Sequence, residues 1–227
     1  MHCQFKPIKK TLTGDSFHGV TKKKLYSSSL SDGNFSISGE LSLKQLAHSE
    51  TDYIPAFVRK CVEFIETEGI KVEGLYRVPG NQSQVVLIEQ KFAVDANMSM
   101  YALDLPVSAV TTALKNFFAN LSEPLISAEL YQPLIEERRP DVRLKLLRHV
   151  LQRLPLENRA VLSYVVNHLR HVAEHVHVTS MDHRNLAKCW WPTLVRPHFE
   201  NFESMAMMSQ PLEELVQVLL DNPSILE

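Results

Sequence analysis

The sequence predicts an all-α fold, a single compact multi-helix domain preceded by a polar leader. Apolar residues recur at intervals of three and four from about residue 53 to residue 220, which is the period of amphipathic helices. Glycines, prolines and capping side chains divide this stretch into runs of one helix each. After residue 50, no segment alternates apolar and polar residues convincingly enough to compete as a strand.

The first three predicted helices occupy residues from about 53 to 124. Gly69 ends the first, Asn81 caps the second, and the third opens at Asp104 and Pro106 and closes at Pro124. In order, their apolar faces consist of Ile54, Phe57, Val58, Cys61, Phe64 and Ile65; Val85, Leu87, Ile88 and Phe92; and Val107, Val110, Leu114, Phe117, Phe118 and Leu121.

Four further helices are predicted after residue 140, with short helical stretches between residues 125 and 140. Pro155 halts the fourth helix, and Pro192 breaks the sixth. The candidate caps of the sixth helix are Thr179, Ser180 and Asp182. The apolar faces are Leu144, Leu147, Val150, Leu151 and Leu154; Val161, Leu162, Val165, Val166, Leu169, Val172 and Val176; Leu186 to Trp190; and Leu212, Leu215, Val216 and Leu219.

The composition indicates a soluble globular protein. The 227 residues are 44% hydrophobic and 22% charged, which is enough apolar material for a buried core. The net charge of −2 gives no reason to expect nucleic-acid binding. No window approaches the roughly 18 apolar residues of a membrane span, and the first residues lack the apolar core of a secretory signal. Three scattered cysteines without a CxxC pair favour reduced thiols in the cytosol.

Residues 1–50 are predicted to be a basic, Ser-rich leader, either disordered or left from a preceding module. Seven lysines against four acids give this stretch a charge of +3, which leaves −5 for the helical domain of residues 51–227. Residues 27–34 have the composition of a linker. Lys22, Lys23 and Lys24 could touch anionic lipid, but three lysines fall short of the four to eight typical of such a site.

Arg77 occupies a loop between the first two predicted helices, residues 74–80, with the sequence Gly-Leu-Tyr-Arg-Val-Pro-Gly. The glycines permit sharp turns and close backbone approach, and Pro79 restricts the chain. The residues that can anchor this loop in the core are Leu75, Tyr76 and Val78. An arginine held rigidly outward is a fork-shaped, always-charged donor suited to phosphate oxygens. From the loop alone, an ordinary connection whose arginine forms a surface ion pair is equally compatible.

Two other segments carry candidate residues. Residues 113–125 read Ala-Leu-Lys-Asn-Phe-Phe-Ala-Asn-Leu-Ser-Glu-Pro-Leu and place Lys115 at the margin of an apolar helical face, where a solvated charge is the commoner role. Residues 185–197 read Asn-Leu-Ala-Lys-Cys-Trp-Trp-Pro-Thr-Leu-Val-Arg-Pro, a helix containing Asn185 that runs into a proline-bounded loop. Adjacent tryptophans lie on different sides of a helix, so at least one is expected to pack against another element.

Taken together and in this order, the three segments resemble the Rho GTPase-activating domain (RhoGAP) family. Its first signature, Gly-aliphatic-aromatic-Arg ending in Ser-Gly, is similar to residues 74–80. Its second, Leu-Lys-x-Phe-Phe-x-x-Leu-Pro-x-Pro-Leu, is similar to residues 114–125. Its third, Asn-Leu-Ala followed by an aromatic or Gly and then Pro and Leu, is similar to residues 185–194. The resemblance spans about residues 53–220.

This resemblance implies a GTPase-activating protein for Rho-family small GTPases in the GTP-bound state. Arg77 would be an arginine finger that enters the partner's nucleotide site in trans and switches signalling off. Lys115 and Asn185 would help to hold the finger loop and the partner's switch regions. The other residues implied to support the finger or line the contact are Tyr76, Val78, Pro192, Thr193 and Arg196. GTP and magnesium would belong to the GTPase, so the chain is expected to need no cofactor and to have no substrate pocket of its own.

The sequence departs from the family pattern at four positions. Pro79 stands where a small serine is usual, and Ser122 replaces the first proline of the second signature. Ala119 takes the place of a basic residue found in some members, and Thr193 that of an asparagine found in many. These departures motivate an alternative function, a module of the same fold that binds GTPases or adaptors without stimulating hydrolysis.

His168, His171 and His175 share one helix face, a spacing that is also compatible with a metal site. There is no HExxH motif, and Glu174 is offset from that face, which favours solvated or core-edge histidines. No phosphate-binding GxxxxGK loop or GxSxG nucleophile turn is present. We expect a cytoplasmic signalling protein that regulates the cytoskeleton, reaches membranes through its partners and binds neither metal nor nucleic acid.

Overall fold

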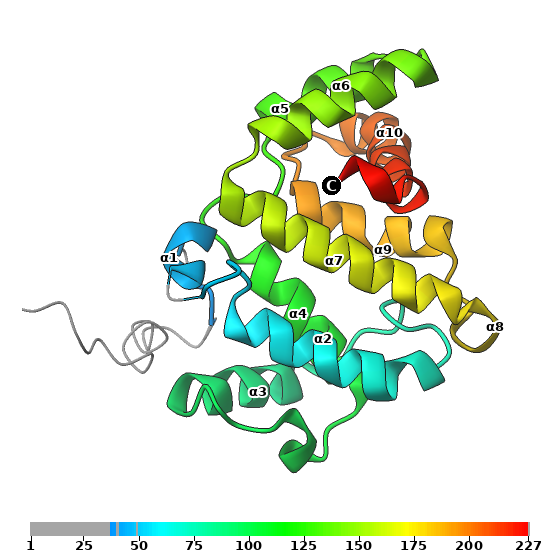
Figure 1. The fold of residues 1–227 in the computed structure, drawn as a ribbon. Helices are drawn as coiled ribbons and strands as arrows, with labels where there is room; N and C mark the ends of the chain where they lie inside the picture. The colour runs from blue at the N-terminus through cyan, green and yellow to red at the C-terminus, as the bar shows by residue number, and fades with distance from the viewer. Residues whose placement is uncertain (1–36, 40, 49, 227) are drawn as a thin grey trace, which may run out of the picture.

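The computed structural model describes residues 37–39, 41–48 and 50–226 (Figure 1). These residues form ten α-helices and no strand, so the predicted all-α fold is confirmed for them. The helices are α1 Leu43–Ala47, α2 Ala56–Glu68, α3 Gln82–Val94, α4 Val107–Ala119, α5 Ala128–Glu136, α6 Pro140–Arg153, α7 Leu156–Glu174, α8 Val176–Thr179, α9 His183–Val195 and α10 Phe202–Asp221. Short 3₁₀ turns lie at Gly69–Lys71, Met100–Leu103 and Pro223–Ile225.

The core lies where α2, α4, α7 and α9 pack together, with α3 beyond α4 and α10 beside α9 (Figure 1). The ring of Phe57 lies 5.0 Å from that of Phe92 and 5.7 Å from that of Phe117. Phe118 continues the aromatic cluster toward Trp190, 6.2 Å away. Each such ring contributes about 1.5–3 kcal/mol by leaving water. Trp190 is fully buried, which confirms that one of the adjacent tryptophans packs against other elements.

Two of the predicted helix starts are confirmed by their capping contacts. The side chain of Asn81 accepts a hydrogen bond from the Ser83 amide at 2.9 Å at the start of α3. The carboxylate of Asp182 accepts from the Asn185 amide at 2.7 Å at the start of α9. These caps matter for the site because they set the first turn of the helix that carries Asn185.

The end of the predicted leader is a packed helix. Ser42 and Gln45 form a capping box at the start of α1, which packs against α7. The apolar residues that α1 and the preceding segment bury are Ile37, Leu43, Leu46 and Ala47. The helical domain therefore begins before residue 51, and five residues were too few for their periodicity to stand out. The predictions for residues 1–36, including Lys22 to Lys24, lie outside the described residues.

The prediction that Pro192 breaks its helix is wrong, because α9 continues to Val195. Proline removes one backbone donor, but the turn after it is stabilised by tertiary packing. Leu194 and Val195 are buried, and the carbonyl of Leu194 accepts a hydrogen bond from the Ile126 amide at 3.1 Å. The predicted loop after Pro192 therefore starts only at Arg196.

Other predicted helix faces need smaller corrections. Leu87 was assigned to the core, but its side chain is 39% exposed. The long helix α7 ends at Glu174, so Val176 lies in the separate helix α8 and is also exposed. The last helix begins at Phe202, about ten residues before its strongest apolar run, because Asn201 and Ser204 form a second capping box.

Candidate functional site

The loop of residues 74–80 follows the 3₁₀ turn after α2 and leads into α3. Leu75 and Tyr76 are buried, whereas Arg77 is exposed. Gly74 and Tyr76 both have a φ of 70°, the left-handed region in which the chain can reverse direction within a few residues. The amides of Arg77 and Val78 donate to the carbonyl of Gly74 at 2.8 and 3.2 Å. A tight turn therefore presents Arg77 outward.

Both ends of this loop are fastened to other elements. The Gly74 amide donates to the carbonyl of Thr179 in α8 at 2.7 Å. The Gly80 amide donates to the hydroxyl of Thr112 in α4 at 2.8 Å. A Cβ atom at Gly80 would lie 2.6 Å from the Cα of Ala109, so only glycine fits against the α4 backbone. The expected close approach at the glycines is thus confirmed at Gly80.

The guanidinium of Arg77 is held only loosely. It donates to the carbonyl of Ser180 at 3.4 Å, which is long for a hydrogen bond, and to the sulfur of Met181 at 3.5 Å, which is a weak acceptor. In the part of the chain that the structure describes, no carboxylate lies within ion-pair distance of Arg77. The alternative of a surface ion pair therefore receives no support from these residues.

Lys115 lines the same pocket as Arg77, although the two are 38 residues apart in the sequence. Both line a pocket of about 250 Å³ together with Tyr76, Pro79, Thr111, Thr112 and Asn116. Burial of the amine lowers the pKa of Lys115 from its usual value. Among the described residues no carboxylate forms an ion pair with Lys115 either.

Asn185 meets Arg77 at the turn between α8 and α9. Its side-chain amide donates to the carbonyl of Ser180 at 3.2 Å, the same oxygen that Arg77 approaches. Ser180 has a φ of 56°, which points this carbonyl toward both side chains. Cys189, one helical turn further along α9, is half-buried, and burial raises the pKa of its thiol although Lys115 and Arg77 act in the opposite direction.

The arrangement suits the recognition of an anion on another molecule. Arg77, which is exposed, and Lys115, which is half-buried, line the same pocket, and the described residues supply no carboxylate to neutralise them. Charge-assisted hydrogen bonds from such groups to phosphate oxygens are among the strongest in proteins. Sequence reasoning named all three residues, and the structure brings Arg77, Lys115 and Asn185 together.

A family model for the RhoGAP domain matches residues 55–199, which is more than half of the chain. The chain belongs to the RhoGAP family. The matched region contains the Arg77 loop, Lys115 and Asn185. The predicted resemblance is therefore confirmed.

Relatives of this RhoGAP chain are much longer proteins. Rho GTPase-activating protein 190 of Drosophila melanogaster is 41% identical over 194 residues, which cover 78% of this chain and 12% of that protein. Rho GTPase-activating protein 35 of Rattus norvegicus is 37% identical over 155 residues, which cover 67% of this chain and 10% of that protein. The chain thus spans about a tenth of the length of these relatives.

Two solved structures share the fold. The BH domain from Graf, the GTPase regulator associated with focal adhesion kinase, superposes with a TM-score of 0.67 at 26% identity, covering 75% of this chain and 92% of that one. Human Rho GTPase activating protein 15 superposes with a TM-score of 0.72 at 24% identity, covering 83% of this chain and 92% of that one. The second likeness shows the fold alone.

The other predicted site residues of this RhoGAP chain have different surroundings. Val78 was expected to anchor the loop in the core, which is wrong, because its side chain is 55% exposed. Thr193 and Pro192 lie within α9 rather than in a loop, and Thr193 is buried. Arg196, at the left-handed end of α9, donates to the carbonyls of Ala119, Leu121 and Ser122. Its guanidinium therefore ties the end of α4 to the end of α9.

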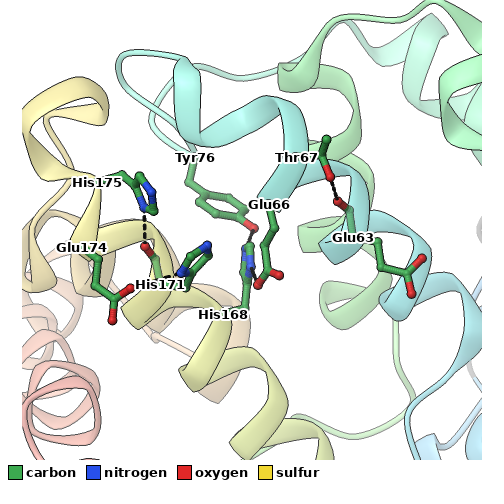
Figure 2. A network of polar contacts seen from close by, with 8 residues as sticks. All are labelled: Glu63, Glu66, Thr67, Tyr76, His168, His171, Glu174 and His175. Carbon is green, nitrogen blue, oxygen red and sulfur yellow. Dashed lines mark hydrogen bonds and ion pairs between the residues drawn. The ribbon is translucent and has the colours of Figure 1, made fainter.

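Sequence reasoning missed the residues beneath the finger loop. The hydroxyl of Tyr76 is hydrogen-bonded to His168 of α7 at 2.6 Å, and His168 in turn contacts Glu66 of α2 (Figure 2). A signal was available, since His168 shares the apolar stripe of α7 with Val161, Val165 and Val172. A polar residue on such a stripe is expected to have a buried partner.

The described residues contain no group of three or more His, Cys, Asp or Glu side chains that could hold a metal ion. His168 is turned into the core, whereas His171 pairs with Glu174 at 3.1 Å. The helices from α1 to α10 likewise include none that is long and apolar enough to span a membrane.

Proposed function

We propose that this RhoGAP domain accelerates GTP hydrolysis on a Rho-family small GTPase by inserting Arg77 into the partner's nucleotide site. One observation carries the proposal. Arg77 is exposed on a loop fastened at both ends, lines a pocket with Lys115 and has no carboxylate partner among the described residues. An arginine kept for a structural ion pair would have a carboxylate partner within its own chain.

The chemistry requires little from this chain beyond a well-placed positive charge. Phosphoryl transfer spreads negative charge over the phosphate oxygens, and an arginine supplied in trans neutralises it. Such a finger is worth about 10³ to 10⁵ in rate, or roughly 4 to 7 kcal/mol of transition-state stabilisation. The attacking water, the GTP and the magnesium ion all belong to the GTPase.

The loose contacts of Arg77 fit this role. Its contacts to Ser180 and Met181, at 3.4 and 3.5 Å, cost little to break when the guanidinium moves to a phosphate. The backbone bonds of Gly74 and Gly80 do not involve the side chain, so they keep the loop in place during that movement.

The neighbouring residues have distinct parts in the proposal. Lys115 adds positive charge at the base of the finger, and Asn185 holds the Ser180 carbonyl against which Arg77 rests. Exposed Val78 and Pro192 contact the GTPase surface. Pro79 leaves the loop anchored, since the amide of Gly80 still reaches Thr112.

The remaining residues act indirectly. Tyr76, Thr193 and Arg196 support the site from within the fold, because the first two are buried and the third is bonded to three carbonyls of the α4 end. The protein works in the cytoplasm and reaches membranes through its GTP-bound partner.

A panel of Rho- and Rac-type GTPases loaded with GTP tests the function. Single-turnover hydrolysis is measured with and without the chain, and binding of each GTP-bound GTPase is measured in parallel. We expect at least one member to hydrolyse GTP about a thousand times faster or more. Binding without acceleration on every member would establish the alternative, a RhoGAP module that docks GTPases without stimulating hydrolysis.

A further inference from the structure

Tyr76 is the residue on which the direction of the finger depends. It directly precedes Arg77, its side chain is buried, and its φ of 70° lies in the left-handed region that residues with a Cβ rarely adopt. Gly74, three positions away from Arg77, also has a φ of 70° but is free of this penalty. Contacts of the Tyr76 side chain must therefore hold its backbone in place.

Those contacts form a hydrogen-bonded chain through the core (Figure 2). The Tyr76 hydroxyl lies 2.6 Å from Nε2 of His168, and Nδ1 of the same ring lies 2.8 Å from Oε1 of Glu66. The three residues come from the finger loop, α7 and α2. Glu66 is the outer end of the chain, with 37% of its side chain exposed, whereas His168 is almost completely buried.

One protonation pattern satisfies every member of this chain. Burial lowers the pKa of His168, which keeps the ring neutral at neutral pH despite the opposing effect of Glu66. The hydrogen bond from His168 lowers the pKa of Glu66, so this group is an ionised acceptor. Nδ1 of His168 therefore carries the proton and donates to Glu66, and Nε2 accepts a hydrogen bond from the hydroxyl of Tyr76.

Aromatic packing fixes the same side chain from two further directions. The Tyr76 ring stands edge-on to Trp190 of α9, with centroids 5.1 Å apart, and to the ring of His168, 5.9 Å apart. Packing alone would be satisfied by phenylalanine, which buries the same ring without a polar group. The hydroxyl also fixes the orientation of the side chain, because it links the loop to Nε2 of His168 in α7.

We propose that His168 and Glu66 are positioning residues, which act through the Tyr76 hydroxyl to hold the backbone turn that presents Arg77. Their catalytic effect rests on the proposed function, but their hold on the loop does not. Because His168 is buried and acts through Tyr76, we expect the loss of this link to slow the chemical step rather than to weaken GTPase binding.

The first arm of the test measures the loop itself in the full chain without any GTPase. Tyr76→Phe removes the hydroxyl and keeps the ring, and Tyr131→Phe, equally buried but in α5, is the matched control. We expect the hydrogen-exchange rates of the Arg77 and Val78 amides to rise about three- to tenfold in Tyr76→Phe and in His168→Leu. This is the change that the loss of one hydrogen bond would cause. Exchange equal to that of Tyr131→Phe would overturn the proposal.

The second arm measures single-turnover GTP hydrolysis. Tyr76→Phe is expected to lower kcat about three- to tenfold with KM for the GTPase unchanged. Glu66→Gln, whose amide oxygen still accepts from Nδ1, is expected to retain activity that Glu66→Ala loses. In an Arg77→Ala background, Tyr76→Phe should cost nothing more, and an undiminished loss there would contradict an effect exerted through Arg77.

The two arms separate this proposal from the proposed function. If the wild-type chain stimulates no GTPase, the function fails, while the amide exchange still decides whether His168 and Glu66 hold the loop. If stimulation is strong but exchange in Tyr76→Phe matches the control, the function stands and the positioning role is rejected.

Discussion

At the scale of single residues, the finger loop combines two opposite requirements. Tyr76 is buried and strained, while its neighbour Arg77 is exposed and only loosely held. A left-handed residue with a side chain costs roughly 1–2 kcal/mol, which the hydrogen bond to His168 and the ring contact with Trp190 offset. The buried contacts of Tyr76 thus fix the direction in which the side chain of Arg77 points.

Gly80→Ala tests how tightly the loop is fastened to α4. A Cβ at this position meets the backbone at Ser108 and Ala109, which cannot move aside as a flexible side chain would. We expect a loss of about 2 kcal/mol in the free energy of unfolding, measured by urea denaturation, together with a marked fall in GTPase stimulation. A variant as stable and active as wild type would show that the close approach is not needed.

Lys115→Met tests whether the ammonium group of Lys115 is needed for activity although it lowers the stability of the folded protein. Burial lowers the pKa of Lys115, which means that the folded protein disfavours the charged form. We expect the variant to be as stable as wild type or up to about 1 kcal/mol more stable, yet about tenfold less active in GTP hydrolysis. Lys145→Met, on the exposed face of α6, is the control. Unchanged activity of Lys115→Met would show that Lys115 is not part of the site.

The residues of the site could be predicted only where they occur within recognisable segments. Arg77, Lys115 and Asn185 each lie in a signature segment, and the family resemblance that these segments carry implied that they act together. Ser180 could not be found in this way, because its role depends on a contact about one hundred residues away along the chain. For His168, the apolar stripe of α7 indicates a buried position, but the partner Tyr76 leaves no local pattern in the sequence.

At the scale of elements, Arg196 joins the ends of α4 and α9. Ser122, where the family has a proline, leaves the end of α4 without that rigid residue, and the guanidinium of Arg196 instead binds three carbonyls there. We expect Arg196→Ala to lower the free energy of unfolding by about 1–3 kcal/mol in thermal or urea denaturation. If stability is unchanged and only GTPase binding falls, the residue acts at the interface instead.

Helix α3 carries a buried acid that makes stability depend on pH. Glu89 is 2% exposed, no described group hydrogen-bonds its Oε1, and burial raises its pKa from 4.5 to about 8. Since the folded pKa lies above the unfolded value, the unfolded chain releases this proton first as pH rises. The contribution of Glu89 to stability is therefore full below about pH 4.5 and declines up to about pH 8.

Glu89→Met removes the titrating group from α3 and keeps a side chain of similar length. We expect the variant to be about 1–3 kcal/mol more stable than wild type at pH 8, with the difference shrinking as the pH falls toward 4.5. Urea denaturation of both proteins across this range provides the measurement. Two parallel stability curves would mean that Glu89 ionises as freely in the fold as in the unfolded chain.

Helices with a long run of regularly spaced apolar residues could be predicted from the sequence. Helical segments that depend on tertiary packing could not. The seven principal helices follow from their spacing and caps, as Asn81 and Asp182 illustrate. Pro192 was expected to end α9, but the buried residues Leu194 and Val195 extend the helix beyond it. Helix α1 was missed because its five residues gain stability only by packing on α7.

At the scale of the whole molecule, the fold brings three distant segments to one face. The loop of residues 74–80 lines a pocket with the middle of α4 and shares the Ser180 carbonyl with the start of α9, and the core connects α2, α7 and α9. Under the proposed function, the fold would serve as a support for the guanidinium of Arg77.

The most direct test of the account compares wild type, Arg77→Ala and Arg77→Lys in single-turnover GTP hydrolysis on a responsive GTPase, with Arg138→Ala as the control for loss of an exposed arginine. We expect Arg77→Ala to lower kcat about a thousandfold while the affinity for the GTP-bound GTPase changes less than about tenfold. Lysine should restore little, because it lacks the planar fork. Stimulation by Arg77→Ala within about threefold of wild type would contradict the finger assignment.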